Sequence, residues 1–385
     1  MSQRGSVRRR NKTWTAYWWS TDPTGRRVQR SKGGFRTRAE AQRHLTHTLN
    51  SLQTGSYVEP SNDTVNAYLT SQWLPAIQAS VRPSSLYSYR RNIELHVLPT
   101  LGGVRLQQLT ADRLNTLYAE LLRSGNRGRG GGLSPKTVRY IHTILHKALK
   151  DAVRWGRVPR NVASDAEPPK LSAGGKNEMR TWTAEQLREF LLFTSSDRLS
   201  AAFLLAGTTG MRRGEVLGLR WSDVDLERAS LTVRRSLITV AYVPQFSEPK
   251  TRRSVRVIQL DPVTVKALRV HKAKQAEERL AWGVAYLSTG LVFARENGAL
   301  IHPERFTQLF DLHVKNSKLD RIRLHDLRHT HATLALSAGV PPKIISDRLG
   351  HSTVAFTQDV YIHAIPSMQS EAAAKVADLI FGESN

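Results

Sequence analysis

The sequence of 385 residues contains no cysteine, which excludes disulfide bonds, thiolate-ligated zinc and a cysteine nucleophile. It also lacks any uninterrupted apolar run of about 18 residues, so no segment is expected to span a membrane as a helix. Residues 1–12 carry basic side chains with no apolar stretch behind them, which is not the pattern of a signal peptide. These absences indicate an intracellular, soluble protein.

Acidic side chains are scarce as well. Lysine and arginine number 57 against 32 aspartates and glutamates, which gives a formal net charge of +25 at pH 7. Hydrophobic residues make up 40% of the chain, enough for a sizeable core, and the length suggests two or three domains. A chain this basic is typical of proteins that bind a polyanion, with nucleic acid as the first candidate and an anionic membrane as the second.

The positive charge is most concentrated in residues 1–58, which hold twelve basic and two acidic side chains. Residues 13–18 are rich in β-formers, 22–25 carry a turn signal, and 26–30 are interpreted as the returning strand. The pattern from Thr37 to Glu40 is that of a capping box and predicts a helix to about residue 50. We therefore expect a small sheet plus one helix, basic on one face.

The alternative for this segment is a basic tail of solvated charge. Aromatic side chains interleaved with the basic ones argue against disorder. The candidate nucleic-acid contacts are Arg8, Arg9, Arg10, Trp14, Tyr17, Arg26 and Arg27.

Residues 64–158 have the apolar periodicity of helices. Helices are predicted over 64–78, 84–95 and 111–123, and Ser134 followed by Pro135 predicts the start of another. The last helix has one apolar stripe at three- and four-residue spacing, formed by Val138, Ile141, Ile144, Leu145, Ala148, Leu149 and Ala152. Before it lies a basic, glycine-rich loop at 126–132, in which Arg127 and Arg129 are further candidate contacts.

Residues 159–176 have linker composition, and a mixed segment follows them. Helices are expected from Thr183, over 198–207 and over 212–220. Residues 229–240 are interpreted as one strand and 254–260 as a second, with Lys250 in the connection between them.

The residues most suggestive of chemistry lie at 324–331. His325 and Arg328 are three apart, so on a helix they share a face and suit a phosphate oxygen. One alternative is a metal site, because His325 and His329 have the spacing of a zinc-binding helix. Against it, an arginine within the pair would repel a cation. The other alternative is a purely structural histidine cluster.

Four further motifs accompany this one, and together they resemble the tyrosine recombinase (phage integrase) family. The sequence has Thr-Gly-x-Arg-x-x-Glu at 209–215, a lysine at 250, His-x-x-Arg at 325–328, Leu-Gly-His at 349–351 and a tyrosine at 361. The order and spacing are those of the family. Arg212 also falls near a predicted helix N-terminus, where free backbone N–H groups favour an anion.

The resemblance implies a role for each of these side chains. Tyr361 would be the nucleophile that attacks the scissile phosphate and forms a 3′-phosphotyrosine. Arg212 and Arg328 would clamp the non-bridging oxygens, and Lys250 would protonate the leaving 5′-oxygen. His325 and His351 would hydrogen-bond the phosphate or assist the proton of the tyrosine. Glu215 would orient Arg212. Such chemistry needs neither a metal nor another cofactor.

The fold implied is multidomain and mainly α with small β-sheets. We expect an arm-type DNA-binding domain with a small sheet plus a helix at 1–58, a helical core-type DNA-binding domain at 64–158, and an α+β catalytic domain at 177–385. The function implied is site-specific recombination that integrates or excises a mobile element such as a prophage. A type IB-like topoisomerase and a catalytically inactive DNA-binding regulator are the alternatives.

The implied partners are double-stranded DNA at core-type and arm-type attachment sites and three further copies of the chain, forming a tetramer. An excision factor and a DNA-bending protein are candidate accessory partners, and the expected location is the cytoplasm of a bacterial host, at the nucleoid. A narrow apolar stripe, at Ala372, Val376, Leu379 and Ile380, predicts a C-terminal helix that packs on its own domain or on a neighbouring protomer.

Overall fold

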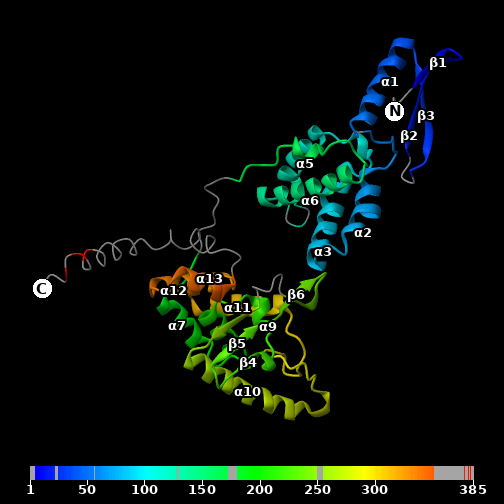
Figure 1. Ribbon diagram of the computed structural model, residues 1–385. Helices are drawn as coiled ribbons and strands as arrows, with labels where there is room; N and C mark the ends of the chain where they lie inside the picture. The colour runs from blue at the N-terminus through cyan, green and yellow to red at the C-terminus, as the bar shows by residue number, and fades with distance from the viewer. Residues whose placement is uncertain are drawn as a thin grey trace. The chain divides into compact units, whose positions relative to one another are not determined.

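The computed structural model describes residues 5–21, 25–55, 57–126, 128, 130–171, 180–248, 255–350, 377, 380 and 382 (Figure 1). The chain divides into two compact units, Met1–Gly175 and Lys176–Asn385. Helices dominate both units and the sheets are small, which confirms the expected fold class. Among the described residues, no helix is long and apolar enough to cross a bilayer.

The first unit begins with a three-stranded antiparallel sheet of β1 (Ser6–Arg10), β2 (Thr13–Thr21) and β3 (Arg27–Phe35), in that order. Helix α1 (Arg38–Gln53) packs on this sheet, and its capping box between Thr37 and Glu40 is present as predicted. Ala16 and Trp18 of β2 and Leu45 of α1 form the small core between them. Strand β1 is an addition to the predicted elements.

The rest of this unit is helical. Its elements are η1 (Ala67–Trp73), α2 (Leu74–Ile77), α3 (Pro83–Asn92), η2 (Ile93–Val97), α4 (Leu98–Leu101), η3 (Leu106–Gln108), α5 (Ala111–Ser124), α6 (Pro135–Arg154) and η4 (Val162–Ser164). Ser134 caps α6 as predicted, and the whole predicted apolar stripe of that helix is buried. The predicted helix over 64–78 differs in detail, because η1 has π-helical hydrogen bonding. The buried Trp73 indole donates to Asp151 at 2.9 Å, which satisfies both groups inside the core.

The second unit mixes helices with two small sheets. Its helices are α7 (Ala184–Phe193), α8 (Ser200–Thr209), α9 (Arg213–Leu217), α10 (Pro262–Trp282), α11 (Pro303–Ser317), α12 (Asp326–Ser337) and α13 (Pro342–Leu349), with short turns η6 (Trp221–Asp223) and η8 (Gly283–Ala285). One sheet has the order β4-β5-β8, formed by β4 (Val224–Asp225), β5 (Ser230–Val233) and β8 (Arg256–Gln259). The other is the hairpin of β6 (Ser236–Val240) and β7 (Val243–Ser247).

Two predictions in this unit were wrong in detail. The single strand expected over 229–240 is two strands in different sheets, because β5 pairs with β8 while β6 pairs with β7. The helix expected over 212–220 ends at Leu217, where Gly218 follows as the C-cap. The capping box of α7, formed by Thr183 and Gln186, is present as predicted.

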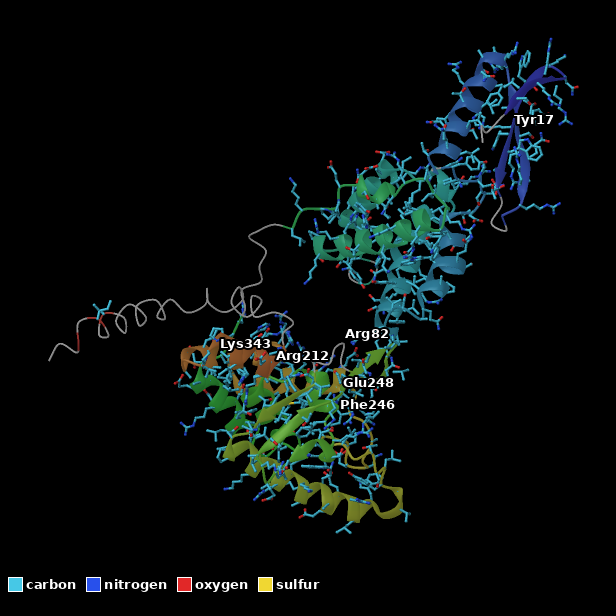
Figure 2. All side chains as sticks on the ribbon, in the orientation of Figure 1. Tyr17, Arg82, Arg212, Phe246, Glu248 and Lys343 are labelled. Carbon is cyan, nitrogen blue, oxygen red and sulfur yellow. The ribbon has the colours of Figure 1, made fainter. Side chains whose placement is uncertain are left out.

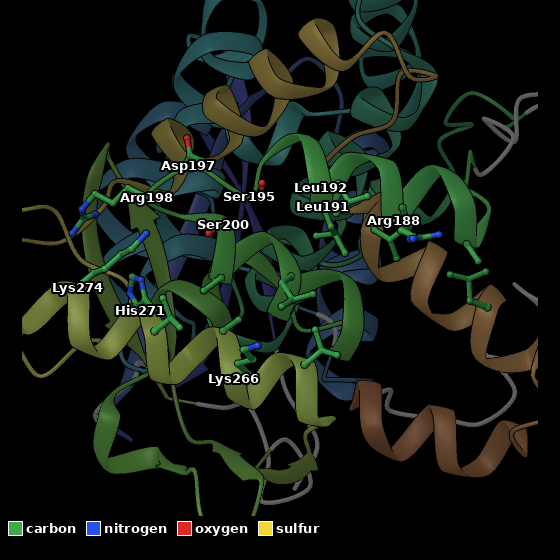
Figure 3. A pocket seen from close by; sticks show the side chains of 18 residues that line it. Arg188, Leu191, Leu192, Ser195, Asp197, Arg198, Ser200, Lys266, His271 and Lys274 are labelled. Atoms are coloured by element: carbon green, nitrogen blue, oxygen red, sulfur yellow. The ribbon is translucent and has the colours of Figure 1, made fainter.

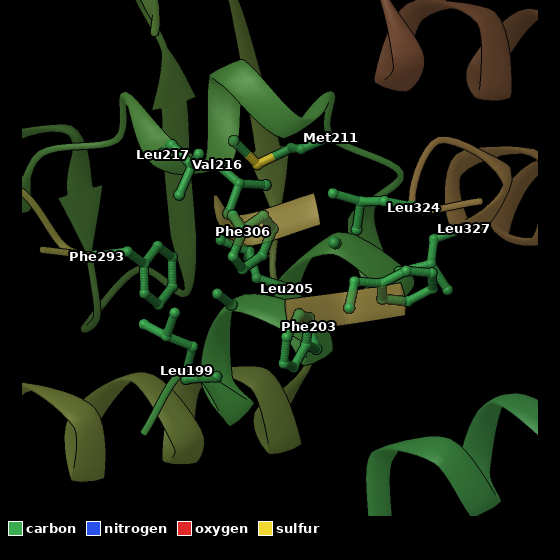
Figure 4. Packing of buried hydrophobic residues seen from close by; sticks show 14 of the residues in the cluster. Leu199, Phe203, Leu205, Met211, Val216, Leu217, Phe293, Phe306, Leu324 and Leu327 are labelled. Carbon is green, nitrogen blue, oxygen red and sulfur yellow. The ribbon is translucent and has the colours of Figure 1, made fainter. Parts of the chain in front are cut away.

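Helix α8 runs through the centre of the second core. Its Phe203 stacks on Phe306 of α11, with ring centroids 5.1 Å apart. Figure 4 shows Val216 of α9 and Leu327 of α12 in the same cluster. The core therefore holds the end of α8, the start of α9 and the first turn of α12 together, and these segments carry Arg212, His325 and Arg328 of the candidate catalytic set.

Candidate active site

Arg212 occupies the N-cap position of α9, as its predicted place near a helix N-terminus requires. The chain reaches it through Gly210, which ends α8 with a φ of 65°. Any side chain here would be strained, and a Cβ would come within 2.5 Å of a methyl carbon of Leu349. Glycine therefore permits the close contact between this turn and the end of α13.

Arg328 lies in the first turn of α12 and is only 3% exposed. Its Nη1 donates to the carbonyl of Gly210 at 2.9 Å, and its Nη2 donates to the carbonyl of Leu349 at 2.8 Å. His325 is the N-cap of the same helix. One buried guanidinium therefore connects the turn before Arg212 with the end of α13.

Arg212 reaches the same helix end from the other side. Its Nη1 donates to the carbonyl of Leu349 at 3.4 Å and its Nη2 to that of Gly350 at 3.2 Å. Gly350 caps α13 in the left-handed conformation, with a φ of 67°. The two arginines of the predicted clamp thus converge on the backbone directly before His351. Arg212, whose side chain is 42% exposed, is the more accessible of them.

A buried carboxylate holds Arg212 in place. Glu215 accepts hydrogen bonds from the backbone N–H and the Nη1 of Arg212, each at 2.9 Å. On its other side it accepts two bonds from Arg256 of β8, at 3.1 and 2.8 Å. Burial alone would raise the pKa of Glu215, but the hydrogen bonds and charge of Arg256 and the charge of Arg212 outweigh it and lower the pKa to about 2. Glu215 is therefore ionised at neutral pH and orients Arg212.

Three histidines of this region are shifted towards the neutral form. Burial, followed by the charge of Arg328, lowers the pKa of His325. Burial and the neighbouring His325 lower the pKa of His329 to about 4. Burial and the charge of Arg348 lower the pKa of His331 to about 4. Of the three, His325 belongs to the predicted catalytic set, and its neutral form can accept a proton.

The zinc-like spacing of His325 and His329 leads to a ring contact in the structure. The two ring centroids are 5.2 Å apart with an interplanar angle of 89°. Within the described parts of the chain, no group of three or more histidine, cysteine, aspartate or glutamate side chains is arranged to hold a metal ion.

Five predicted site residues lie outside the described residues. They are Lys250, His351 and Tyr361 of the catalytic set and Arg127 and Arg129 of the basic loop. No motif of the sequence marks Arg256, whose guanidinium binds Glu215 in the structure. A faint signal existed, because Arg256 occupies one of the two inward positions of β8, where an apolar residue is expected.

The N-terminal sheet divides its candidate contacts between two faces. Ser6 pairs with Tyr17 and Arg8 with Thr15, so Arg8 and Tyr17 lie on the face that points away from α1. Figure 2 labels Tyr17 on this sheet. The Arg8 guanidinium lies 5.6 Å from the centroid of the Tyr17 ring, within cation–π range. This face therefore combines cations with aromatic surface.

The same face extends along the neighbouring strands. Arg10 shares it by strand alternation, and Arg27 of β3 lies 5.0 Å from the ring of Trp19. Arg9 pairs with Trp14 on the opposite face; Arg9 is exposed there, and the guanidinium of Arg38 in α1 lies 5.9 Å from the centroid of the Trp14 ring. Arg26 is exposed directly before β3. The register thus separates Arg8, Arg10, Tyr17 and Arg27 from Arg9 and Trp14.

Comparison with known proteins places this architecture in a family. Residues 180–368 match the phage integrase family, residues 6–52 match an arm DNA-binding domain, and residues 67–122 match the phage integrase N-terminal SAM-like domain. A tyrosine recombinase XerC-like protein of Caldanaerobacter subterraneus subsp. tengcongensis is 26% identical over 374 residues, covering 93% of this chain and 94% of its own. The ICEBs1 integrase of Bacillus subtilis is 28% identical over 317 residues, covering 81% and 82%.

Solved structures share the fold. The Tn1549 transposon integrase in complex with a circular intermediate DNA has a TM-score of 0.67 at 21% identity, over 82% of this chain and 99% of that one. A lambda integrase tetramer bound to a Holliday junction has a TM-score of 0.52 at 18% identity, over 90% and 95%.

The chain belongs to the tyrosine recombinase (phage integrase) family. It is a site-specific recombinase that cleaves and rejoins DNA. The comparisons do not favour the two alternatives, a type IB-like topoisomerase and an inactive regulator.

Proposed function

We propose that this recombinase integrates and excises a mobile element, with Arg212, Lys250, His325, Arg328, His351 and Tyr361 as its catalytic residues. The observation that carries the proposal is the convergence of Arg212 and Arg328 on the end of α13, directly before His351. The bonds from Arg212 to the two carbonyls are long, and a phosphate oxygen is a stronger acceptor. An incoming phosphate can therefore replace them.

In the proposed cleavage step the Tyr361 oxygen attacks the scissile phosphorus. The bond from tyrosine oxygen to phosphorus forms and the bond from phosphorus to the 5′-oxygen breaks, leaving a 3′-phosphotyrosine. The phenol proton passes to His325 or His351, and Lys250 supplies a proton to the leaving 5′-oxygen. Arg212 and Arg328 stabilise the charge that develops on the non-bridging oxygens. Attack by another 5′-hydroxyl reverses the step and joins new strands.

DNA recognition is divided in the proposal between an arm-type domain at 1–58 and a core-type domain at 64–158, with catalysis in 177–385. The outer face of the N-terminal sheet supports the first assignment, because Arg8 and Arg27 lie over aromatic rings there. Cations bind the phosphates while the rings contact sugars and base edges. Arg127 and Arg129 would add contacts from the core-type domain.

The proposed working form is a tetramer on two paired DNA sites. The solved relative bound to a Holliday junction is a tetramer. An apolar groove of about 590 Å³ between α7, α8 and α10 supports a protomer contact (Figure 3), and its lining includes Leu187, Leu191, Leu204, Val270 and Leu334. The proposed occupant is the apolar C-terminal stripe of a neighbouring protomer. Ala372, Val376 and Leu379 of that stripe lie outside the described residues, whereas Ile380 is 64% exposed.

The proposed recombinase acts on the DNA of a bacterial host. Its substrate would be the chromosome in the cytoplasm of a bacterial host, at the nucleoid. An excision factor would set the direction of the reaction and a DNA-bending protein would bring arm-type and core-type sites together.

A nicked suicide substrate tests the proposed nucleophile. The wild-type protein should form an SDS-resistant adduct with DNA, in excess EDTA as well, because Arg212 and Arg328 supply the positive charge. Tyr361→Phe should bind the same DNA with unchanged affinity and form no adduct. Tyr242→Phe is the matched control, because it removes an exposed tyrosine hydroxyl of the same unit. An undiminished adduct in Tyr361→Phe, or activity lost in EDTA and restored by zinc, would overturn the assignment.

A further inference from the structure

Arg256 is a buried cation whose position in the fold is unusual. It stands in β8 with a side chain that is 6% exposed, at an inward position of a strand that packs on the core. A buried guanidinium is costly unless its donors are satisfied. Nη1 and Nη2 of Arg256 donate to the two carboxylate oxygens of Glu215, at 3.1 and 2.8 Å. Its Nε donates to the carbonyl of Arg348 at 2.7 Å.

Both partners of Arg256 lead to Arg212. Glu215 accepts from Arg212 on its other side, so one carboxylate is shared between the two arginines. The carbonyl of Arg348 belongs to the last turn of α13, and the next two carbonyls along the chain, of Leu349 and Gly350, accept from Arg212. Arg256 therefore contacts both structures that fix the direction of the Arg212 side chain.

The guanidinium of Arg256 packs closely against Gly350. A Cβ on Gly350 would lie 3.1 Å from Nη1 of Arg256 and 3.3 Å from its Cδ and Cζ. Because Gly350 has no side chain, the guanidinium can lie against the backbone at the end of α13. Gly350 thus lies against Arg256 and also accepts a hydrogen bond from Arg212 through its carbonyl.

We propose that Arg256 is a positioning residue for strand cleavage: it fixes Glu215 and the last turn of α13, and through them aligns Arg212 with the scissile phosphate. The proposal rests on the function assigned to Arg212 above. The competing view is that Arg256 only stabilises the attachment of β8 to the core.

Arg256→Lys separates these views with little change in size or charge. One ammonium cannot make two parallel bonds to Glu215 and also reach the carbonyl of Arg348. Glu215 then loses its fixed orientation, and Arg212 follows it. Because a misplacement of about 1 Å at a reacting centre costs up to about 100-fold in rate, single-turnover cleavage of a suicide substrate should fall about 10- to 100-fold. The affinity for core-site DNA should stay within about twofold, since phosphate contacts elsewhere dominate it.

Arg235→Lys in the full chain is the matched control. Arg235 forms an ion pair with the buried Asp223 in the same unit, outside the Glu215 network. It should lose stability comparably and retain wild-type cleavage. The positioning role is supported if the melting temperatures of Arg256→Lys and Arg235→Lys fall by the same amount but only Arg256→Lys cleaves more slowly.

A substrate with a methylphosphonate at the scissile position separates a positioning role from a loss of protein stability. A less stable protein should lose the same fraction of its cleavage rate on this substrate as on the normal one. It removes the charge of one non-bridging oxygen, so the transition state depends less on Arg212. The defects of Arg256→Lys and Arg212→Lys should shrink together on this substrate. The double variant should cleave the normal substrate no more slowly than Arg212→Lys alone, because both act through one group.

Several results would overturn the inference. The first is a wild-type rate of cleavage by Arg256→Lys. The second is a double variant whose loss in rate is the product of the losses of Arg256→Lys and Arg212→Lys. The third is a loss in rate for Arg256→Lys that is as large on the methylphosphonate substrate as on the normal one. If Arg256→Lys does not fold, Arg256→Gln, which retains an amide donor toward Glu215, is measured against the same criteria. Tyr361-dependent adducts in the wild-type protein are the reference: their absence contradicts the proposed function, whereas their presence with normal cleavage by Arg256→Lys contradicts only this inference.

Discussion

Replacing Glu215 by glutamine should remove a large, pH-dependent part of the stability of the second unit. Glutamine has the shape of the protonated acid, so Glu215→Gln mimics the state in which the carboxylate is neutral. The folded pKa of about 2, against an ordinary value of 4.5, means that the folded unit binds the ionised form more favourably than the unfolded chain does. The difference corresponds to about 3 kcal/mol at neutral pH.

The sign of the pH dependence follows from the lowered pKa. Stability from Glu215 is fully present above the unfolded pKa and is lost as pH falls towards the folded pKa. The wild-type protein should exceed Glu215→Gln by about 3 kcal/mol at pH 7, by nearly as much at pH 4.5, and by about half as much at pH 3. A loss of this size agrees with the cost of breaking a buried ion pair, about 3–5 kcal/mol.

Urea unfolding followed by hydrogen exchange of peptides from α9 and β8 would measure this difference in the unit that carries Glu215. Glu227→Gln is the control, because Glu227 forms an exposed pair with Arg269 and should change the unfolding free energy by less than about 1 kcal/mol. A difference below 1 kcal/mol for Glu215→Gln at pH 7, or one as large at pH 3 as at pH 7, would refute the reasoning.

Three further outcomes are expected. Gly210→Ala should destabilise the second unit by about 1–3 kcal/mol in urea unfolding and slow cleavage, because its φ is 65° and the new Cβ would meet Leu349; unchanged stability would contradict this. His331→Phe should flatten the loss of stability between pH 6.5 and 4, since the neutral form of His331 is favoured on folding and stability falls as pH drops through this range. Arg27→Ala should reduce the slope of log affinity for arm-type DNA against log salt concentration by about one unit. An unchanged slope would show that Arg27 does not contact a phosphate.

Elements with strong local signals could be predicted from the sequence. The capping residues Thr37, Ser134 and Thr183 begin helices as expected, because a cap depends only on the few residues after it. The buried stripe of α6 follows from the period of the helix in the same way. Local sequence signals do not predict an element whose formation depends on pairing with another strand. Strand β1 is short and holds three arginines, so little in its composition marks it as a strand.

The division of residues 229–240 depends on partners elsewhere in the chain. Both halves contain β-formers, and the break between them appears only because Leu231 pairs with Ile258 while Leu237 pairs with Phe246. The residues in the middle have no local reason to end a strand. Long-range hydrogen bonding therefore sets this boundary.

For the candidate site, the sequence by itself determined the residue types and their order, since the motifs around Arg212 and Arg328 are contiguous stretches. Only the tertiary structure decided how these motifs meet: both arginines donate to the carbonyl of Leu349, and Arg256 shares Glu215 with Arg212. These contacts join segments far apart along the chain, and a buried arginine in a strand can be recognised as functional only once its partners are known. The physical reason is that local backbone preferences act over a few residues, whereas the burial and pairing of charge depend on every segment that packs around them.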